Sequence, residues 1–295
     1  MTLISANQKM KDCFDSPSAE KQIVSFIQKT VKKANANGVV LGLSGGIDSA
    51  VVAALSAKAL GSENVWCFFF HTGNTYENDF MDALSVEKQF GFHLQKIDMG
   101  SIFLSAKSVM NTVDFAAENN ETHETQNAFE SRIADGNLKS RLRMSLLYNF
   151  ANESNLLVIG TKNKTEKMTG YFTKFGDGGV DFEPIADLYK TEVRLLAKHM
   201  NLPENILSKV PSAGFFEGQS DEADFGISYD ELDAFLEWVE KRKSDGKNKK
   251  FGEKEIRMIE KSGIPKEKAV SILERMKRAK HKQKMPASLK LKDKK

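Results

Sequence analysis

The sequence predicts an α/β fold in which a doubly wound, mostly parallel sheet carries helices on both faces. Two observations predict it. The runs "GVVLGL" (38–43) and "NVWCFFF" (64–70) are short and almost wholly apolar, as strands buried on both faces are. Segments with helical spacing of apolar residues alternate with these runs, which is typical of a parallel sheet covered by helices. In such sheets, ligands bind beyond the carboxyl ends of the strands.

The individual elements follow in order along the chain. The first predicted helix, 18–36, carries apolar residues at helical spacing from Ile23 to Val31. Further helices are expected at 49–60, 81–91, 137–152 and 187–203, with Gly61, Gly91 and Pro203 marking three of their ends. Strands are expected at 38–43, 64–70, 92–99 and 155–161. We interpret Phe68, Phe69 and Phe70 as core rather than as a ligand stack.

Composition limits the class of protein. The 295 residues suffice for one large α/β domain, which we place at 1–275, followed by a tail at 276–295. The two cysteines, Cys13 and Cys67, form neither a CxxC pair nor a disulfide framework, so they indicate a reducing compartment. The N-terminus lacks the apolar stretch of a signal peptide, and no apolar run is long enough to span a membrane. We expect a cytoplasmic protein.

Charge is distributed unevenly. The tail 276–295 has nine Lys or Arg against one Asp, a net +8, so the other residues sum to −5 within the total of +3. Such a tail is commonly a solvated end. It also suits a segment that folds onto an anionic ligand. Nucleic-acid binding ranks lower, because the body shows no matching basic stripe with aromatics.

The segment "LGLSGGIDSA" (41–50) is the first candidate site. It joins a predicted strand to a predicted helix, so backbone N–H groups of the turn and the positive end of the helix dipole face outward together. That arrangement suits a phosphate or pyrophosphate. The segment matches neither GxxxxGK[ST] nor GxGxxG. Its two serines and two glycines can hold phosphate oxygens, and Asp48 can hold Mg²⁺. The polar loop "GTKNKTE" (160–166) follows the fourth predicted strand, so we expect both loops at one edge of the sheet.

"SGGIDS" resembles the SGGxDS pyrophosphate loop of the N-type ATP pyrophosphatases, which cleave ATP between its α and β phosphates. The resemblance implies the adenine nucleotide α hydrolase-like version of this fold. Within that superfamily, residues 160–203 and "PSAGFFEGQSDEADFGISYDELD" (211–233) look like the ammonia-dependent NAD synthetases, and the similarity runs from about residue 20 to the tail. The thiolating members rely on cysteine pairs, which this chain lacks.

The resemblance implies a reaction. Members of the family convert nicotinate adenine dinucleotide (deamido-NAD), ATP and ammonia into NAD, the last step of NAD biosynthesis. The substrate carboxylate attacks the α-phosphate of ATP, which gives an adenylate and pyrophosphate, and ammonia then displaces AMP. Because negative charge crowds the reacting phosphates, cations must neutralise it. Mg²⁺ is therefore the implied cofactor, and ATP the co-substrate.

The resemblance also implies site residues. Mg²⁺ would be shared by Asp48 and Glu166, and the implied catalytic residues are Asp48, Lys190 and Asp177. ATP contacts are implied for Gly42, Leu43, Ser44, Gly45, Gly46, Ile47, Asp48, Ser49, Thr161, Lys190 and Ser212. Contacts with deamido-NAD are implied for Asn137, Arg141, Lys174, Asp177, Asp181, His281 and Lys282. The aspartates among them are hypothesised to steer ammonium and accept a proton.

Each assignment has a plainer alternative. Asp48 can be a helix cap, Glu166 a solvated carboxylate and Asp177 a turn residue in "GDGG". Lys190 and Arg141 can be ordinary helix-face charges, and His281 a solvated residue of the tail. Three functional alternatives remain: another adenylating enzyme of this loop class, such as a GMP synthetase ATPase subunit; a non-catalytic nucleotide-binding regulator; and an RNA modifier that binds through the tail.

Partners also follow from the resemblance. The chain has no room for a fused amidotransferase domain, so we expect direct use of ammonia, with a separate glutaminase subunit left open. The family forms homodimers that hold the dinucleotide across the subunit boundary, and the same is implied here. We expect no nucleic-acid or membrane partner. Residues 71–83 depart from the family pattern, so no adenine or ribose contacts are assigned.

Overall fold

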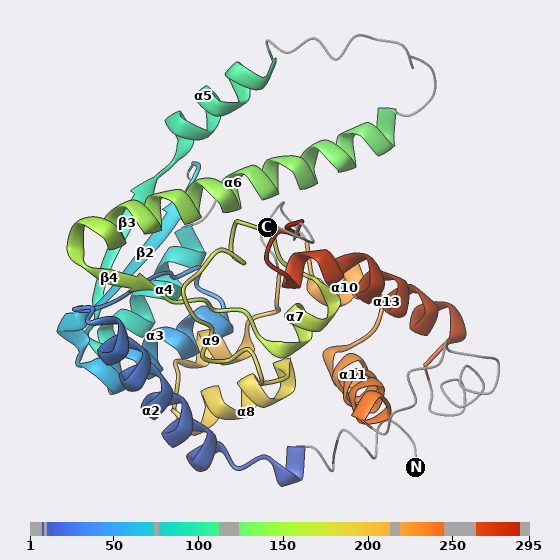
Figure 1. The fold of residues 1–295 in the computed structure, drawn as a ribbon, viewed down its shortest axis with the longest axis horizontal. Coiled ribbons are helices and arrows are strands. Elements are labelled where there is room, and N and C mark those ends of the chain that lie inside the picture. The colour runs from blue at the N-terminus through green and yellow to red at the C-terminus, as the bar shows by residue number, and fades with distance from the viewer. Residues whose placement is uncertain are drawn as a thin grey trace, which may run out of the picture.

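The computed structural model describes residues 8, 11–73, 77–111, 124–212, 219–244 and 264–289. At its centre lies a sheet of four parallel strands in the order β3-β2-β1-β4 (Figure 1). The strands are β1 (Gly38–Gly42), β2 (Val65–His71), β3 (His93–Asp98) and β4 (Leu156–Val158). Along the chain, β2 is added beside β1 and β3 beside β2, and β4 is then added on the other side of β1. The carboxyl ends of β1 and β4 therefore flank the point where the winding direction reverses, which is where such sheets bind ligands.

Apolar residues of the strands alternate between two layers of helices, as buried parallel strands require. Val39 and Leu41 belong to the core beneath one face, and Val40 packs with Phe68 and Val158 on the other. The first face is covered by α2 (Ser16–Ala34), α3 (Ile47–Leu60), α4 (Glu77–Phe90), α8 (Lys190–His199) and α9 (Glu204–Ser208). The other face is covered by α6 (Glu124–Ser154), whose outer half extends away from the sheet beside α5 (Gly100–Asn111).

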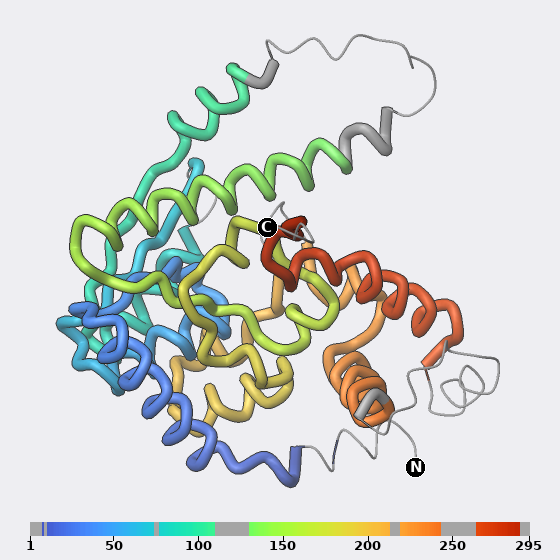
Figure 2. Tube along the Cα trace, viewed as in Figure 1, coloured from blue at the N-terminus to red at the C-terminus, as the bar shows by residue number. Residues whose placement is uncertain are grey.

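A second apolar cluster lies to the side of the sheet. It contains Tyr229, Phe235 and Ile272 and joins α10 (Asp221–Phe225), α11 (Tyr229–Ser244) and α13 (Lys266–Ala279). Figure 2 shows the C-terminal part of the chain, drawn red, beside the segment that contains α7 (Lys164–Thr169). Hydrogen bonds from Lys282 and Gln283 to backbone carbonyls of that segment fix the contact. The start of the tail thus packs on a loop at the carboxyl edge of the sheet.

The predicted fold class and the order of the elements are confirmed, but several bounds were wrong. The helix expected at 137–152 begins at Glu124, because its polar first half lies away from the sheet and needs no continuous apolar face. The helix expected at 187–203 spans only Lys190–His199, since Tyr189 and Met200 are its caps. The strand expected at 155–161 is limited to Leu156–Val158, followed by one bridge from Ile159 to Phe182.

The remaining expectations about the fold had mixed outcomes. Phe68, Phe69 and Phe70 are buried, as predicted. Helix α5 was not predicted at all. Residues 245–263 lie outside the described residues. Within the described ranges, no helix is both long and apolar enough to cross a membrane.

Candidate active site

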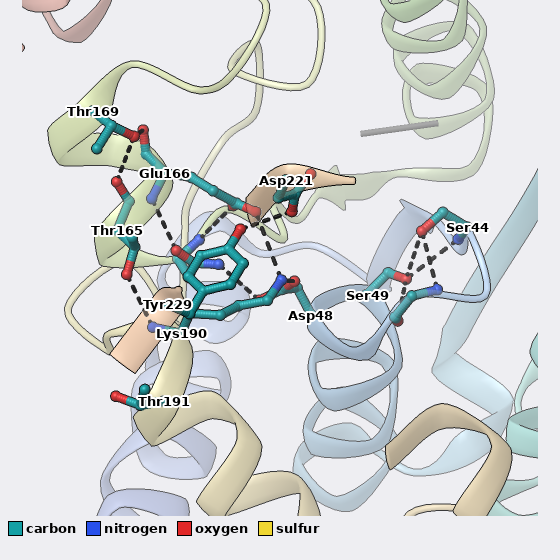
Figure 3. Close-up of polar contacts among 12 residues, drawn as sticks. Ser44, Asp48, Ser49, Thr165, Glu166, Thr169, Lys190, Thr191, Asp221 and Tyr229 are labelled. Carbon is teal, nitrogen blue, oxygen red and sulfur yellow. Dashed lines mark hydrogen bonds and ion pairs between the residues drawn. The ribbon is translucent and has the colours of Figure 1, made fainter. Parts of the chain in front are cut away.

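The loop after β1 is held in a tight turn by glycine and serine. Gly45 has φ of +74°, and a side chain there would lie 2.3 Å from the backbone oxygen of Asp79, so only glycine fits. The Ser49 hydroxyl donates to the carbonyl of Gly46 at 3.0 Å and accepts from the Ser44 amide at 3.2 Å (Figure 3). These bonds fold the loop back over the first turn of α3. The N-terminus of α3 therefore faces the cavity, where it favours an anion.

Asp48 lies in that first turn, and its side chain points away from its own helix. The N-cap of α3 is Gly46, and no side chain caps the helix, so Asp48 is not the cap that the plainer interpretation allowed. Its carboxylate accepts a hydrogen bond from Asn163 Nδ2 at 2.9 Å and forms an ion pair with Lys190. The loops after β1 and β4 are thus joined through Asp48, as the sheet topology predicts.

Lys190 is the buried cation of the site. Its side chain is only 3% exposed, and its ammonium lies against Asp48 and 4.0 Å from Glu166 Oε1. Burial lowers the pKa of Lys190, but the charges of Asp48 and Glu166 outweigh that effect and raise it. Lys190 is therefore charged between the two carboxylates, and it is not an ordinary helix-face charge.

Glu166 is positioned by the start of α7. Asn163 is the N-cap of this helix, and the two residues form a reciprocal capping box: Glu166 N donates to Asn163 Oδ1, and Asn163 N to Glu166 Oε2. Burial, and next the charge of Asp48, raise the pKa of Glu166 well above its usual value. A carboxylate so placed favours a cation beside it. Asn163, fully buried, links both acids and was missed, although the N-x-x-E spacing is the sequence signal of a capping box.

Buried hydrogen bonds beneath the site fix the backbone of Lys190. The Thr165 hydroxyl accepts from Lys190 N at 3.0 Å and donates to Asp233 Oδ1 at 2.5 Å. Asp233 Oδ2 accepts from Thr191 N at 2.8 Å. Helices α7, α8 and α11 therefore meet around Asp233, and the position of Lys190 depends on all three.

Asp221 is a further acid that the sequence did not single out. It is 3% exposed, accepts a hydrogen bond from the Tyr229 hydroxyl at 2.7 Å through Oδ2, and leaves Oδ1 buried without a partner (Figure 3). Its negative charge contributes to raising the pKa of Glu166 and of Lys190. The site thus holds more negative charge than Lys190 alone neutralises.

A divalent cation fits this set of donors. Carboxylate oxygens are the ligands that Mg²⁺ prefers, and the unpartnered oxygen of Asp221 adds negative charge beside Asp48 and Glu166. In the part of the chain that the structure describes, no group of three or more His, Cys, Asp or Glu side chains is placed to hold a metal ion by itself. Mg²⁺ is commonly bound through one or two carboxylates, with substrate phosphates completing its shell.

These residues line a cavity of about 1070 Å³ at the carboxyl edge of the sheet. Most residues that the resemblance assigned to ATP lie on its wall: Gly42, Leu43, Ser44, Gly46, Ile47, Asp48, Ser49, Thr161, Lys190 and Ser212. Gly45 supports the loop from behind and is buried. Glu166, Asn137, Asp177 and Lys282 line the same cavity, so the structure brings three of the predicted dinucleotide residues to the predicted ATP residues.

Two of the predicted dinucleotide residues shape a loop. Asp177 Oδ1 accepts from the Ser140 hydroxyl at 2.9 Å and from Thr173 N at 2.8 Å. Asn137 Oδ1 accepts from the Thr173 hydroxyl at 2.6 Å. Asp177 therefore serves the turn of the "GDGG" loop, as the plainer alternative held, and also faces the cavity. The loop is tied to α6 at both points.

The remaining predicted residues lie outside the cavity wall of this chain. Arg141 is exposed and donates to the backbone oxygen of Lys174 at 3.3 Å, and Lys174 extends over the Phe175 ring. Asp181 accepts from the Tyr148 hydroxyl and from Val158 N, which ties it to β4. His281 is exposed, next to the cavity-lining Lys282.

Lys209 is another residue that sequence reasoning missed. Its ammonium donates to the backbone oxygen of Gly45 at 3.1 Å and pairs with Asp79 and Asp82, each at 2.6 Å. Hydrogen bonds to the two aspartates outweigh burial and raise its pKa. Lys209 therefore connects the loop after β1 to α4. Nothing in its local sequence "LSKVPS" signals this contact.

Comparison with known proteins shows which family the sequence resembles. A family model described as NAD synthase matches residues 19–286. An NH(3)-dependent NAD(+) synthetase from Methanococcoides burtonii is 40% identical over 272 residues, which cover 92% of this chain and 94% of the relative.

Solved structures are similar over nearly the whole length. An NMN synthetase from Francisella tularensis superposes with a TM-score of 0.75 at 31% identity, covering 94% of this chain and 100% of that one. An NH3-dependent NAD synthetase from Campylobacter jejuni, in complex with the nitrate ion, superposes with a TM-score of 0.70 at 32% identity and the same coverage. The range matched by the family model, 19–286, includes every residue that lines the cavity.

Proposed function

The chain belongs to the NAD synthase family, and we propose that it converts deamido-NAD to NAD with ammonia and ATP, releasing AMP and pyrophosphate. It is a ligase, as its relatives are. The observation that carries the proposal is the position of Lys190 between Asp48 and Glu166 at the N-terminus of α3. One cavity wall carries a cation, two carboxylates that can bind a metal and the N-terminus of a helix. This combination suits the triphosphate of ATP.

The chemistry needs activation of a carboxylate, since ammonia cannot displace oxide from it. The substrate carboxylate attacks the α-phosphorus of ATP, the bond to the β-phosphate oxygen breaks, and pyrophosphate leaves. Ammonia then attacks the acyl carbon of the adenylate, AMP leaves, and the nitrogen loses a proton to give the carboxamide. A bound Mg²⁺, held by Asp48 and Glu166, would neutralise charge on the departing pyrophosphate.

The residues of this chain supply the remaining functions. Lys190, held on its backbone by Thr165, places an ammonium beside the phosphates and stabilises the charge that develops on them. The loop from Ser44 to Ser49 binds phosphate oxygens through hydroxyl and backbone N–H groups. The loop around Asp177, fixed to α6 by Ser140, bounds the side of the cavity where the dinucleotide is proposed to bind.

We also propose a homodimer in the cytoplasm, with the dinucleotide site at the subunit boundary. In its support, α5 and α6 expose the apolar residues Ile102, Leu104 and Ile133 at 41%, 66% and 37%. Ile133 also lines the cavity, one turn before Asn137, so one of these exposed apolar residues lies at the site. Both cysteines are free, Cys13 exposed and Cys67 buried, which suits a reducing compartment.

The test is a product analysis. The protein is incubated with ATP, Mg²⁺, ammonium and deamido-NAD, and NAD, AMP and pyrophosphate are measured. We expect the three products in equal amounts. Formation of ADP and phosphate instead would contradict attack at the α-phosphorus, and absence of NAD would overturn the proposal.

A second candidate substrate deserves a parallel arm, because a similar solved structure is an NMN synthetase. Nicotinate mononucleotide carries the same pyridine carboxylate but lacks the second nucleotide. We expect kcat/KM to be higher for deamido-NAD. A reversed preference would assign the chain to amidation of the mononucleotide, with the adenylation chemistry unchanged.

A further inference from the structure

Arg275 is a cation of the cavity wall that neither the motifs nor the proposed mechanism uses. It lies on α13 and lines the cavity with its side chain half-buried. Its guanidinium carbon is 4.9 Å from the centre of the Tyr171 ring and 4.8 Å from that of the Phe225 ring. Two aromatic rings thus hold the guanidinium in place, as in other cation–π contacts, and their carbon atoms offer its N–H groups no oxygen acceptor.

Asp224, the acid whose charge acts on Arg275, already accepts hydrogen bonds from other donors. Asp224 Oδ2 accepts from the Tyr171 hydroxyl at 2.6 Å and from Gln219 Nε2 at 2.8 Å. Among the residues that the structure describes, Arg275 forms neither a hydrogen bond nor an ion pair, and the rings of Tyr171 and Phe225 flank its guanidinium. A guanidinium with five donors, held at a cavity wall without an acceptor, is suited to a ligand that brings oxygens.

Lys282 adds a second cation nearby. Its ammonium donates to the backbone oxygens of Gly170 and Phe172 at 2.9 and 2.8 Å, so it is fixed beside the segment that carries Tyr171. Burial and, next, the charge of Arg275 lower the pKa of Lys282. Burial also lowers the pKa of Arg275. Two cations therefore repel each other across this wall, and an anion between them would relieve the repulsion.

We propose that Arg275 binds the pyrophosphate of the dinucleotide substrate. This inference rests on the proposed function and adds a residue to it. The planar fork of a guanidinium matches two oxygens of a phosphate group. The triphosphate of ATP has its own place at α3 and Lys190, whereas Arg275 faces the loop after α7 that also carries Thr173 and Asp177.

The experiment compares two ligands that share the pyrophosphate. Deamido-NAD and NAD differ only in the carboxylate or carboxamide of the pyridine ring. Their dissociation constants are measured calorimetrically, without ATP, for the wild type, Arg275→Met and the control Arg278→Met, an exposed arginine of the same helix. We expect Arg275→Met to weaken both ligands by about 10- to 100-fold, the effect of one charge-assisted bond, and Arg278→Met to leave both unchanged.

The outcomes separate the possibilities. Weakening of deamido-NAD alone would place Arg275 at the substrate carboxylate and overturn the proposal, as would unchanged affinity for both ligands. Arg275→Lys keeps a cation between the rings but loses the planar guanidinium, so its affinities for both ligands should lie between those of wild type and Arg275→Met. If thermal unfolding shows that Arg275→Met does not fold, Arg275→Lys takes its place in the comparison. If the wild type makes NAD but Arg275→Met binds both dinucleotides with wild-type affinity, this inference is refuted and the proposed function is not. If the wild type makes no NAD, the proposed function itself is refuted.

Discussion

The ammonium group of Lys190 lies against the carboxylate of Asp48, although 142 residues separate them in the sequence. The contact joins the first turn of α3 to the first residue of α8, across the boundary between β1 and β4. Because Glu166 lies on the other side of the same ammonium, one lysine partly neutralises two acids. The site therefore holds one buried positive charge between two carboxylates.

We expect Asp48→Asn and Glu166→Gln each to lower the rate of NAD formation by at least about 100-fold, because an amide is a weak ligand for Mg²⁺. The measurement is pyrophosphate release over a range of Mg²⁺ concentrations, and the concentration needed for half the maximal rate should rise in both variants. Asp187→Asn, at a side chain 97% exposed, is the control. Near-normal rates in both acid variants at low Mg²⁺ would refute the metal assignment.

Lys190→Met should abolish NAD formation and also destabilise the fold. Removing the buried cation leaves Asp48 and Glu166 facing each other unpaired, which we expect to reduce the free energy of unfolding by about 1–3 kcal/mol. Urea denaturation measures the loss. The loss should shrink on acidification, since protonating Glu166 removes the repulsion. A variant as stable as wild type at every pH would show that the two acids tolerate each other without the lysine.

The fold was largely predictable because its signals are local. Two strands of the sheet were predicted from the apolar runs at 38–43 and 64–70. The loop after β1 was predicted from the glycines that follow the first run. Where a signal was weak, the prediction was wrong: the polar first half of α6 has little amphipathic pattern, so its start at Glu124 was missed.

The site was predictable only as far as motifs reach. Asp48 and Glu166 stand in recognisable blocks, and their loops meet because β1 and β4 are neighbours. Lys209 and Arg275 lie in segments without such signals, and Asp221, although it lies in the block 211–233, was given no role. The roles of these residues depend on contacts with α4, the loop after α7 and α11, respectively. Those contacts are set by packing of distant segments, which composition and periodicity do not encode.

Lys209→Met should raise KM for ATP by about 10-fold, with a smaller effect on KM for deamido-NAD. The lysine holds the carbonyl of Gly45 close to Asp79 and Asp82, and without it the two aspartates repel and the phosphate loop loses a contact worth about 1–3 kcal/mol. Steady-state kinetics with each substrate varied in turn measures the effect. The exposed Lys198→Met is the control. Equal changes in both KM values would instead indicate a general loss of structure.

Asp233 gives the fold a defined pH dependence. Burial raises its pKa from 3.8 to about 6, so between these values the folded chain holds a proton that the unfolded chain has lost. The resulting stabilisation is complete below pH 3.8 and disappears as pH rises through 6. The free energy of unfolding of wild type, minus that of Asp233→Asn, should therefore fall by on the order of 2–3 kcal/mol between pH 4 and pH 7. Urea denaturation across that range tests this, and a difference that grows with pH would contradict it.

Leu104→Glu should convert the proposed homodimer to monomers. Leu104, on α5, is 66% exposed, and Lys107 pairs with Asp135 to hold α5 beside α6. In a twofold dimer each substitution acts twice, and each removes about 1.5–3 kcal/mol of apolar burial and adds the cost of burying a charge.

Light scattering coupled to size-exclusion chromatography measures the mass, and NAD formation is assayed on the same samples. Met81→Glu, at an exposed apolar residue of α4, is the matched control and should leave the dimer intact. Because the dinucleotide site is proposed to span the subunit boundary, activity should fall with the dimer and recover at protein concentrations that restore it. A wild type that is monomeric yet fully active would remove the basis for placing the dinucleotide between subunits.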